Sequence, residues 1–210
     1  MTNPFAQLST LQKNKLYDLL GVHIYKFKKN EEILPTIKNQ NMIGIILSGY
    51  AEIIFIEYNG NEIITEKLHE NDVFGTNISF TIHDNCQILA KLDTEVLVID
   101  YQKLMNPKNL EHRYFNIFLH NLFDIIHIKL KEKNDRISIL EKKQIREKLL
   151  EYFEYEYKKT HSRFIYLPFL LKDLADYIAV NRSAMFRELK NMKEERFIEV
   201  KGKKITLLYK

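Results

Sequence analysis

One stretch near the C-terminal end, residues 171–193, constrains the fold of this 210-residue chain more than any other. Its first part repeats apolar residues at helical spacing, namely Leu171, Leu174, Ala175 and Ile178. A short turn over 179–181 ends in Asn181, a residue type well suited to cap a second helix. That second helix would bury Met185, Leu189 and Met192. The pattern predicts a helix-turn-helix.

The exposed face of the second helix differs in chemistry from its apolar back. It carries Arg182, Ser183, Phe186, Arg187 and Lys190. A helix with an apolar back and a basic front has the form that enters the major groove of DNA. We therefore predict base contacts from Arg182, Ser183, Phe186 and Arg187. An ordinary αα-hairpin with a solvated charged face is the alternative.

The residues after this motif predict a β-hairpin, called the wing below. Strand-like residues 197–200 and 205–209 flank the sequence Lys201-Gly202-Lys203-Lys204. Lysines there would meet phosphates, which supply affinity and register but carry no sequence information. An edge hairpin made soluble by lysine would explain the lysines, but not their place beside the motif. The predicted phosphate contacts are Lys172, Asn181, Lys190, Lys201, Lys203 and Lys204.

Charge is divided unevenly between the two halves of the chain. Residues 1–109 hold ten lysines and no arginine against 13 acidic residues, a net charge of −3. Residues 110–210 hold 22 basic against 15 acidic residues, a net charge of +7. Only arginine offers a two-pronged donor to a phosphate or to guanine. The second half is therefore predicted to bind a polyanion.

The first half of the chain predicts an antiparallel β-roll after a short helical lead-in over 5–20. Strand-like runs occupy 24–27, 42–47, 50–56, 61–68, 88–90 and 96–100, with a corner at 72–75. The dipeptide Asn59-Gly60 is a strong turn signal. Many short strands with Gly and Asn at the corners indicate a jelly roll or barrel. The predicted fold class is α+β: β-roll, long helix and winged helix-turn-helix.

A long helix is predicted from Leu110 to about Ile137, a segment without Pro or Gly. Its apolar residues cover two faces, whereas a surface helix needs one. The second face would pack against another copy of the chain, so the pattern indicates a homodimer. A helix buried wholly within one chain is the alternative. A further helix is predicted over 143–159, after a hinge at 138–142. The predicted interface residues are Phe115, Leu119, Leu122 and Ile126.

Several function classes find no support in the sequence. No apolar run of about 18 residues predicts a membrane span, and the N-terminus lacks the blocks of a signal peptide, so we expect a cytoplasmic protein. The single cysteine, Cys86, cannot supply a four-thiolate iron–sulfur or zinc site and is expected to be buried. No catalytic motif is present, so we expect no enzyme. A metal-dependent, cupin-like enzyme would have to use His69, Glu70 and Asp72 in a predicted turn.

The order of lead-in, β-roll, long helix and winged helix-turn-helix resembles the Crp-Fnr family of bacterial transcription regulators over essentially the full chain. Residues 47–53 are similar to the family's strand–glycine–strand corner, and 59–62 to its hairpin tip. Residues 71–75 resemble a second glycine corner, and 88–99 the last strand pair. The resemblance implies a dimer on a near-palindromic DNA site, with half-sites about 34–36 Å apart.

The sequence departs from the family pattern at the ligand site of the β-roll. Members that bind cyclic nucleotides have a Gly-Glu pair and an arginine there. Here Gly75 is followed by Thr76, and Asp84 stands at the arginine position, where it would repel a phosphate. We therefore expect no tight binding of cyclic AMP in the usual mode. One cysteine excludes the family's iron–sulfur sensor, whereas haem sensing stays open. The predicted ligand region, near Gly75, Thr76 and Asp84, selects no particular effector.

A second departure lies in the recognition helix. Many members have Arg-Glu at its start and another arginine further along. Arg182 and Arg187 match the arginines, but Ser183 replaces the glutamate. Serine can donate or accept a hydrogen bond and is less selective. Phe186 stands where most members have a small residue; it would contact a thymine methyl or pack against the first helix.

The resemblance implies a sequence-specific activator or repressor with three parts: an effector domain over 1–109, a dimerisation helix over 110–138 and a DNA-binding domain over 139–210. RNA polymerase is an implied partner and a small-molecule effector a further one. An effector would act by binding two conformations with different affinity. The competing interpretation is a protein-interaction scaffold that uses the winged helix for a partner. No metal and no cofactor is predicted.

Overall fold

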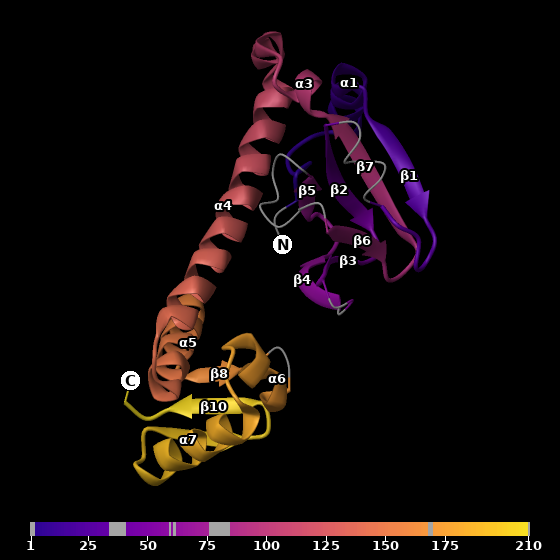
Figure 1. Ribbon diagram of the computed structural model, residues 1–210. Coiled ribbons are helices and arrows are strands. Elements are labelled where there is room, and N and C mark those ends of the chain that lie inside the picture. The colour runs from indigo at the N-terminus through magenta and orange to yellow at the C-terminus, as the bar shows by residue number, and fades with distance from the viewer. Residues whose placement is uncertain are drawn as a thin grey trace. The chain divides into compact units, whose positions relative to one another are not determined.

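The computed structural model describes residues 3–33, 41–58, 60, 62–75, 85–167 and 170–209. It divides into two compact units, Met1–Ile128 and Lys129–Lys210. The division falls inside a single helix, α4 (Arg113–Glu141), which runs unbroken for 29 residues (Figure 1). The predicted boundaries at 109/110 and 138/139 stay predictions, and each unit is described by itself.

The first unit begins with α1 (Thr10–Leu20), shorter than the predicted lead-in over 5–20. The side-chain oxygen of Ser9 accepts the Gln12 amide, and the Gln12 side chain accepts the Ser9 amide in return. This capping box starts the helix at Thr10 because it satisfies backbone donors that the first turn leaves free.

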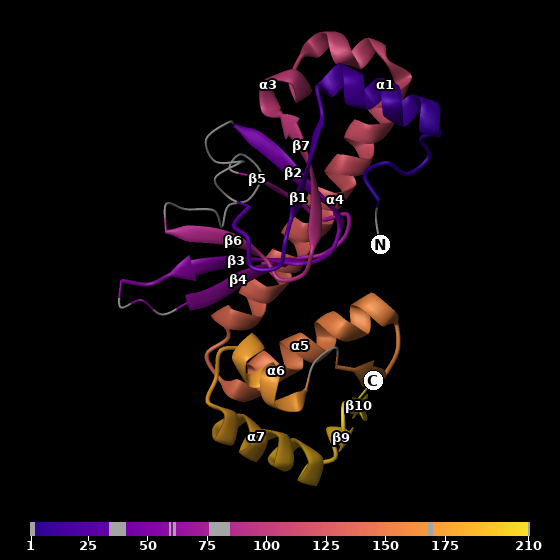
Figure 2. The same ribbon diagram turned by 90° about the vertical axis from the view of Figure 1, so that its right-hand side faces the viewer.

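Within the described residues, seven strands follow α1: six match the predicted strand-like runs in order, and the seventh, β5, forms where only a corner was predicted. They are β1 (His23–Phe27), β2 (Met42–Ser48), β3 (Ala51–Ile56), β4 (Glu62–Leu68), β5 (Val73–Gly75), β6 (Cys86–Ala90) and β7 (Thr94–Asp100). Two antiparallel sheets result, β1-β7-β2-β5 and β4-β3-β6 (Figure 2). The predicted antiparallel roll is confirmed. Asn59 and Asn61 of the predicted hairpin tip lie outside the described residues.

The larger sheet is buried on both faces, as the strand β7 shows. Leu97 and Ile99 point to one cluster of hydrophobic side chains, whereas Val96 and Val98 point to the other. The first cluster is built with helices and the second with strand β3 of the smaller sheet. Successive residues of a strand face opposite sides, so β7 joins the two layers of the roll. Cys86 lies in the second cluster, 3% exposed.

The chain then passes through α3 (Tyr101–Leu104) and a 3-10 turn, η1 (Pro107–Glu111), before α4 begins. The predicted long helix is confirmed, but it ends at Glu141, four residues beyond Ile137. The first part of α4 packs against the unit's own core through Phe115, Phe118, Leu122 and Ile125, which are at most 4% exposed. α3 lies beside α1 at the end of the larger sheet (Figure 1).

The second unit contains the predicted helix-turn-helix and hairpin. After the C-terminal part of α4, its elements are α5 (Ile145–Thr160), β8 (Phe164–Tyr166), α6 (Leu171–Tyr177), α7 (Arg182–Glu194), β9 (Ile198–Lys201) and β10 (Lys204–Leu207). The strands pair in the order β8-β10-β9, and all pairs are antiparallel. The sequence did not predict β8. Its signal is the alternation Phe164-Ile165-Tyr166, of which only Ile165 is buried.

The core of the second unit uses the residues that the helical spacing selected. Leu174, Ala175 and Ile178 are fully buried, and so are Met185 and Met192. Leu149 and Phe153 of α5 complete one side, and Ile205 and Leu207 of β10 the other. The inner faces of both helices and of the small sheet therefore share one apolar core, and their outer faces are left to solvent.

Candidate DNA-binding surface

The N-terminus of α7 is fixed by a side-chain cap, as predicted. The Asn181 Oδ1 accepts the backbone amide of Ala184 at 3.2 Å. The turn before it contains Ala179 with φ +52°, a left-handed conformation that L-residues rarely adopt. The Lys148 ammonium donates to the carbonyl of Ile178 at 3.1 Å and so caps the end of α6. The helix-turn-helix is thus held from α5 as well as from within.

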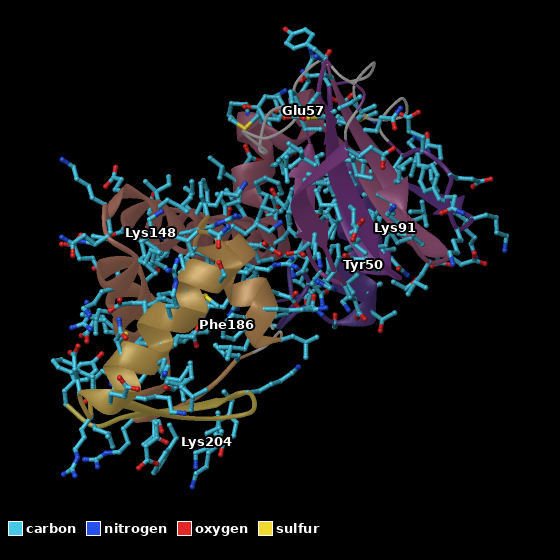
Figure 3. All side chains as sticks on the ribbon, turned by 60° about the horizontal axis from the view of Figure 1, so that its bottom comes forward. Tyr50, Glu57, Lys91, Lys148, Phe186 and Lys204 are labelled. Carbon is cyan, nitrogen blue, oxygen red and sulfur yellow. The ribbon has the colours of Figure 1, made fainter. Side chains whose placement is uncertain are left out.

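The predicted base-reading residues lie together on one exposed face of α7. Arg182, Ser183, Phe186 and Arg187 are all exposed, whereas Met185 and Leu189 beneath them are buried. Phe186, labelled in Figure 3, keeps 44% of its surface exposed. Of the two alternatives left open for Phe186, this exposure favours a surface contact over packing against the first helix.

Ser183 donates its hydroxyl hydrogen to the Asn181 Oδ1 at 2.7 Å. The Asn181 Oδ1 is an amide carbonyl oxygen, which carries no hydrogen and can accept from both Ser183 and the Ala184 amide, so the serine is the donor. The lone pairs of the Ser183 hydroxyl are left to accept. From the sequence, serine could donate or accept a hydrogen bond; in this structure its hydrogen is engaged by Asn181, which favours the acceptor role.

Arg182 meets an acidic partner that the sequence did not single out. Its Nη2 lies 2.6 Å from the Asp176 Oδ2 in α6, and this hydrogen bond raises the arginine pKa. No motif marks Asp176, because the pair depends on how the turn after α6 places the two side chains.

Arg146 of α5 binds two glutamates of α7 and its C-terminal end. Its guanidinium donates to Glu188 and, through both terminal nitrogens at 2.7 Å, to the Glu195 carboxylate. These hydrogen bonds raise the pKa of Arg146, and they lower that of Glu195. The guanidinium also lies 5.9 Å from the centre of the Phe197 ring. Arg146 therefore connects α5 to the middle of α7 and to the residues that follow its C-terminal end.

The predicted phosphate contacts fall into two groups. Lys172, Asn181, Lys190, Lys201 and Lys203 are exposed. Lys204 is half-buried, because its ammonium lies over the rings of Phe164 at 4.2 Å and Tyr166 at 5.7 Å on the outer face of the small sheet (Figure 3). The turn itself consists of Gly202 and Lys203, so Lys203 is the lysine at the tip.

The predicted dimer face needs revision in two of its four residues. Phe115 and Leu122 are 1% and 3% exposed and pack in the core of their own chain, so they have no surface to offer a second copy. Leu119 and Ile126 are only partly buried. Three of the exposed apolar residues of α4 recur every seven residues, namely Phe123, Leu130 and Ile137, whereas Ile128, which is 41% exposed, lies outside this repeat.

Of the predicted ligand region in the β-roll, only Gly75 lies within the described residues. Gly75 has φ +150°, and a Cβ there would lie 2.7 Å from the Met42 carbonyl oxygen, so only glycine fits this close approach. Thr76 and Asp84 lie outside the described residues. Asp72 accepts the His69 amide across a turn. Within the described ranges, no three His, Cys, Asp or Glu side chains gather as a metal site, and no helix could span a membrane.

Comparison with known proteins agrees with this architecture. Residues 25–106 match the family model of the cyclic nucleotide-binding domain. Among solved structures, the chain is similar to a CprK variant in complex with OCPA, with a TM-score of 0.66 and 15% identity over 92% of this chain and 89% of that one. No curated protein sequence matches the chain.

Two further solved structures span nearly the whole chain. A double mutant of CooA from Carboxydothermus hydrogenoformans has a TM-score of 0.59 and 20% identity, over 96% of this chain and 87% of that one. A cyclic nucleotide-binding domain containing protein from Listeria monocytogenes EGD-e has a TM-score of 0.56 and 19% identity, over 93% and 97%. At these identities the likeness shows a shared fold, with the β-roll, long helix and C-terminal helices in the same order.

Proposed function

We propose that this chain, which has the fold of the Crp-Fnr transcription regulators, is a sequence-specific DNA-binding regulator that acts as a homodimer on a near-palindromic operator. One observation carries the proposal: the exposed face of α7 carries two arginines, a serine and an exposed phenylalanine, while its opposite face is buried in the core. As a DNA-binding regulator, the chain would work in the cytoplasm, where it meets DNA.

The side chains of α7 support a specific manner of reading bases. Arg182 and Arg187 would each offer a donor pair to the O6 and N7 of guanine. Ser183, left with only its lone pairs, would accept from an exocyclic amino group, which cytosine and adenine carry in the major groove. Phe186 would touch a thymine methyl. A half-site with guanine next to a base that bears an amino group is the expected operator element.

Phosphate contacts would come from the exposed lysines on either side of the recognition helix. Lys201 and Lys203 of the wing, Lys172 of α6 and Lys190 of α7 carry the charge. Asn181 keeps its side-chain amide for a phosphate, since only its oxygen is used by the cap. Lys204 differs, because its ammonium already lies over two rings.

The dimer would form along the seven-residue repeat of α4, a face that shares only part of the one first predicted. Phe123, Leu130 and Ile137 would occupy one coiled-coil position, with Leu119 and Ile126 in the other. A two-fold dimer would present two recognition helices to half-sites about 34–36 Å apart. This proposal keeps Leu119 and Ile126 from the predicted interface and replaces Phe115 and Leu122.

The remaining parts of the proposal concern regulation. The β-roll over 1–109 would receive an effector, the segment 110–138 would join two copies, and 139–210 would bind DNA and meet RNA polymerase. Thr76 and Asp84 stand where the family members that bind cyclic nucleotides hold the ribose and the phosphate. Cyclic AMP is therefore not the expected effector in the usual mode. Activation or repression would depend on where the operator lies relative to the promoter.

Selection of bound sequences from a random duplex library with the purified chain tests this proposal. A recovered palindrome with guanine-containing half-sites about one helical turn apart supports it. Truncation of Arg187 to Ala should then cost about 1–3 kcal/mol and relax one base position. An affinity loss that is equal for all sequences would contradict base reading by Arg187.

A titration of salt separates the regulator from the competing interpretation. DNA binding that neutralises phosphates weakens steeply as salt rises. Replacement of Lys203 by Ala should reduce that slope and leave the recovered motif unchanged. A chain that selects no duplex sequence, and whose weak DNA binding hardly depends on salt, would instead be an interaction module with a winged helix. No observation on the described residues favours an enzyme.

A further inference from the structure

The ion pair between Asp176 and Arg182 joins the two helices of the helix-turn-helix at the surface where bases would be read. Asp176 lies in the last turn of α6, and Arg182 is the first residue of α7. A single contact is made, from the arginine Nη2 to the Asp176 Oδ2 at 2.6 Å. Both side chains remain more than half exposed, at 56% and 59%. Neither side chain belongs to the apolar core of the described part of this unit.

Both residues of the ion pair lie on backbone that is fixed by its own contacts. The Asn181 cap fixes the start of α7, and the buried residues Leu174 and Ala175 fix α6 in the core. The only large freedom left is the rotation of the long arginine side chain, which is costly to restrain when a ligand binds. Because exposed ion pairs contribute little to folding stability, the consequence of this contact is the orientation of the guanidinium.

The contact leaves the arginine able to bind a base. A guanidinium has five N–H donors, and Asp176 takes one of them. Guanine requires two donors, for its O6 and N7. One guanidinium can therefore hold the carboxylate and the base together, with the carboxylate fixing the direction of the fork.

We propose that Asp176 is a positioning residue that holds Arg182 toward the base it reads and so strengthens discrimination for guanine at that position. The inference rests on the proposed function. It adds a residue of α6 that touches no base and still determines specificity, and it predicts that the pairing is already present in the free protein.

The negative charge of Asp176 has a second effect with the opposite sign. It repels the phosphates of any duplex, so its removal should raise affinity for all sequences alike. Loss of positioning lowers only the preference for guanine. Replacement of Asp176 should therefore tighten binding to mismatched DNA and weaken discrimination at the same time, a combination that a merely structural role would not produce.

Asp173 provides the matched control. It lies one turn earlier on α6 and acts on Arg182 through charge alone. Its carboxylate accepts the Leu170 amide at 3.3 Å, and asparagine retains an oxygen for that bond. Asp176→Asn and Asp173→Asn thus remove the same charge from the same helix, and only the first removes the ionic partner of Arg182.

The experiment measures fluorescence anisotropy with the full chain on the selected operator and on operators with single guanines replaced. The guanine read by Arg182 is the one whose replacement weakens binding of the wild type but not of Arg182→Ala. Discrimination at that base is the dissociation constant for the replaced operator divided by that for the selected operator. Asp176→Asn should lower this ratio by roughly 2- to 12-fold, the scale of ordering one long side chain. Asp173→Asn should leave the ratio unchanged, and so should Asp176→Asn in the Arg182→Ala background.

Three results would overturn the inference. Equal ratios for Asp176→Asn and the wild type would mean that Arg182 needs no positioning. A higher ratio in Asp176→Asn would mean that the carboxylate competes with guanine. A wild-type chain that prefers no sequence would remove the proposed function itself, and this outcome is distinct because it needs no variant to be seen.

Discussion

Truncation of Phe123 to Ala tests the reassigned dimer face most directly. Phe123 is the most exposed apolar side chain of α4, with 63% of its surface exposed. Full burial of an aromatic side chain covers about 150–250 Å², so roughly 95–160 Å² of each copy would be available to a partner. At about 25 cal/mol/Å², this area is worth roughly 2–4 kcal/mol per copy, because apolar surface is removed from water.

Two copies of Phe123 meet in a two-fold dimer, so the loss counts twice. A loss of roughly 5–8 kcal/mol would raise the dimer dissociation constant at least about a thousandfold. Sedimentation equilibrium over a range of chain concentrations measures this constant. Circular dichroism checks that the variant keeps its helices, as expected for a residue outside the buried core.

Phe164 is the matched control for this experiment. It is also an exposed phenylalanine, 46% exposed, but lies on β8 of the small sheet and not on α4. Phe164→Ala should leave the dissociation constant unchanged. A Phe123→Ala chain that dimerises as tightly as the wild type would refute the seven-residue repeat as the interface.

Four further outcomes are expected, each measured by chemical denaturation unless stated otherwise. Gly49→Ala should destabilise the β-roll by about 2 kcal/mol, since Gly49 has φ +92° and the new Cβ would lie 2.4 Å from the Asp93 carbonyl oxygen; an unchanged free energy of unfolding would contradict this. Ala179→Gly should stabilise the second unit by about 1 kcal/mol, because glycine adopts the φ of +52° without strain. Leu189→Ala should cost about 2–5 kcal/mol by opening a cavity under the recognition helix. Burial raises the pKa of Glu156 above its ordinary value, so protonation favours the folded chain: this stabilisation is complete below the ordinary Glu pKa and is lost as pH rises through the folded one. Glu156→Gln should therefore be more stable than the wild type at pH 7, with the difference closing as pH falls, and a difference independent of pH would show that Glu156 titrates normally.

The helix-turn-helix illustrates a part of the structure that sequence reasoning predicted well. Leu174, Ile178, Met185 and Met192 follow helical spacing, and all four are fully buried. Local patterns of this kind succeed because the spacing of apolar residues reports directly which face of a helix turns inward. The Asn181 cap was equally readable, since a cap is a contact between neighbours in sequence.

The dimer face shows where such reasoning fails. Phe115 and Leu122 share their apolar character with Phe123 and Leu130, and spacing along α4 cannot say which stripe meets the chain's own core. The larger β-sheet decides this, because its Leu97 and Ile99 pack in the same cluster as Phe115 and Leu122. Sequence reasoning also missed the strand β8. Its three residues are too few for a recognisable pattern, and they pair with β10 about 40 positions further along the chain.

The sequence by itself determined the class of this molecule: the order of its elements, the apolar back of the recognition helix and the basic charge of its second half. The tertiary structure alone decided how individual polar side chains can act. Ser183 donates its hydroxyl hydrogen to the capping residue Asn181, the Lys204 ammonium lies over two rings, and Arg182 pairs with a carboxylate from another helix. Apolar burial follows a local periodicity that the chain displays, whereas hydrogen-bond partners are set by distances of a few ångströms that exist only after folding.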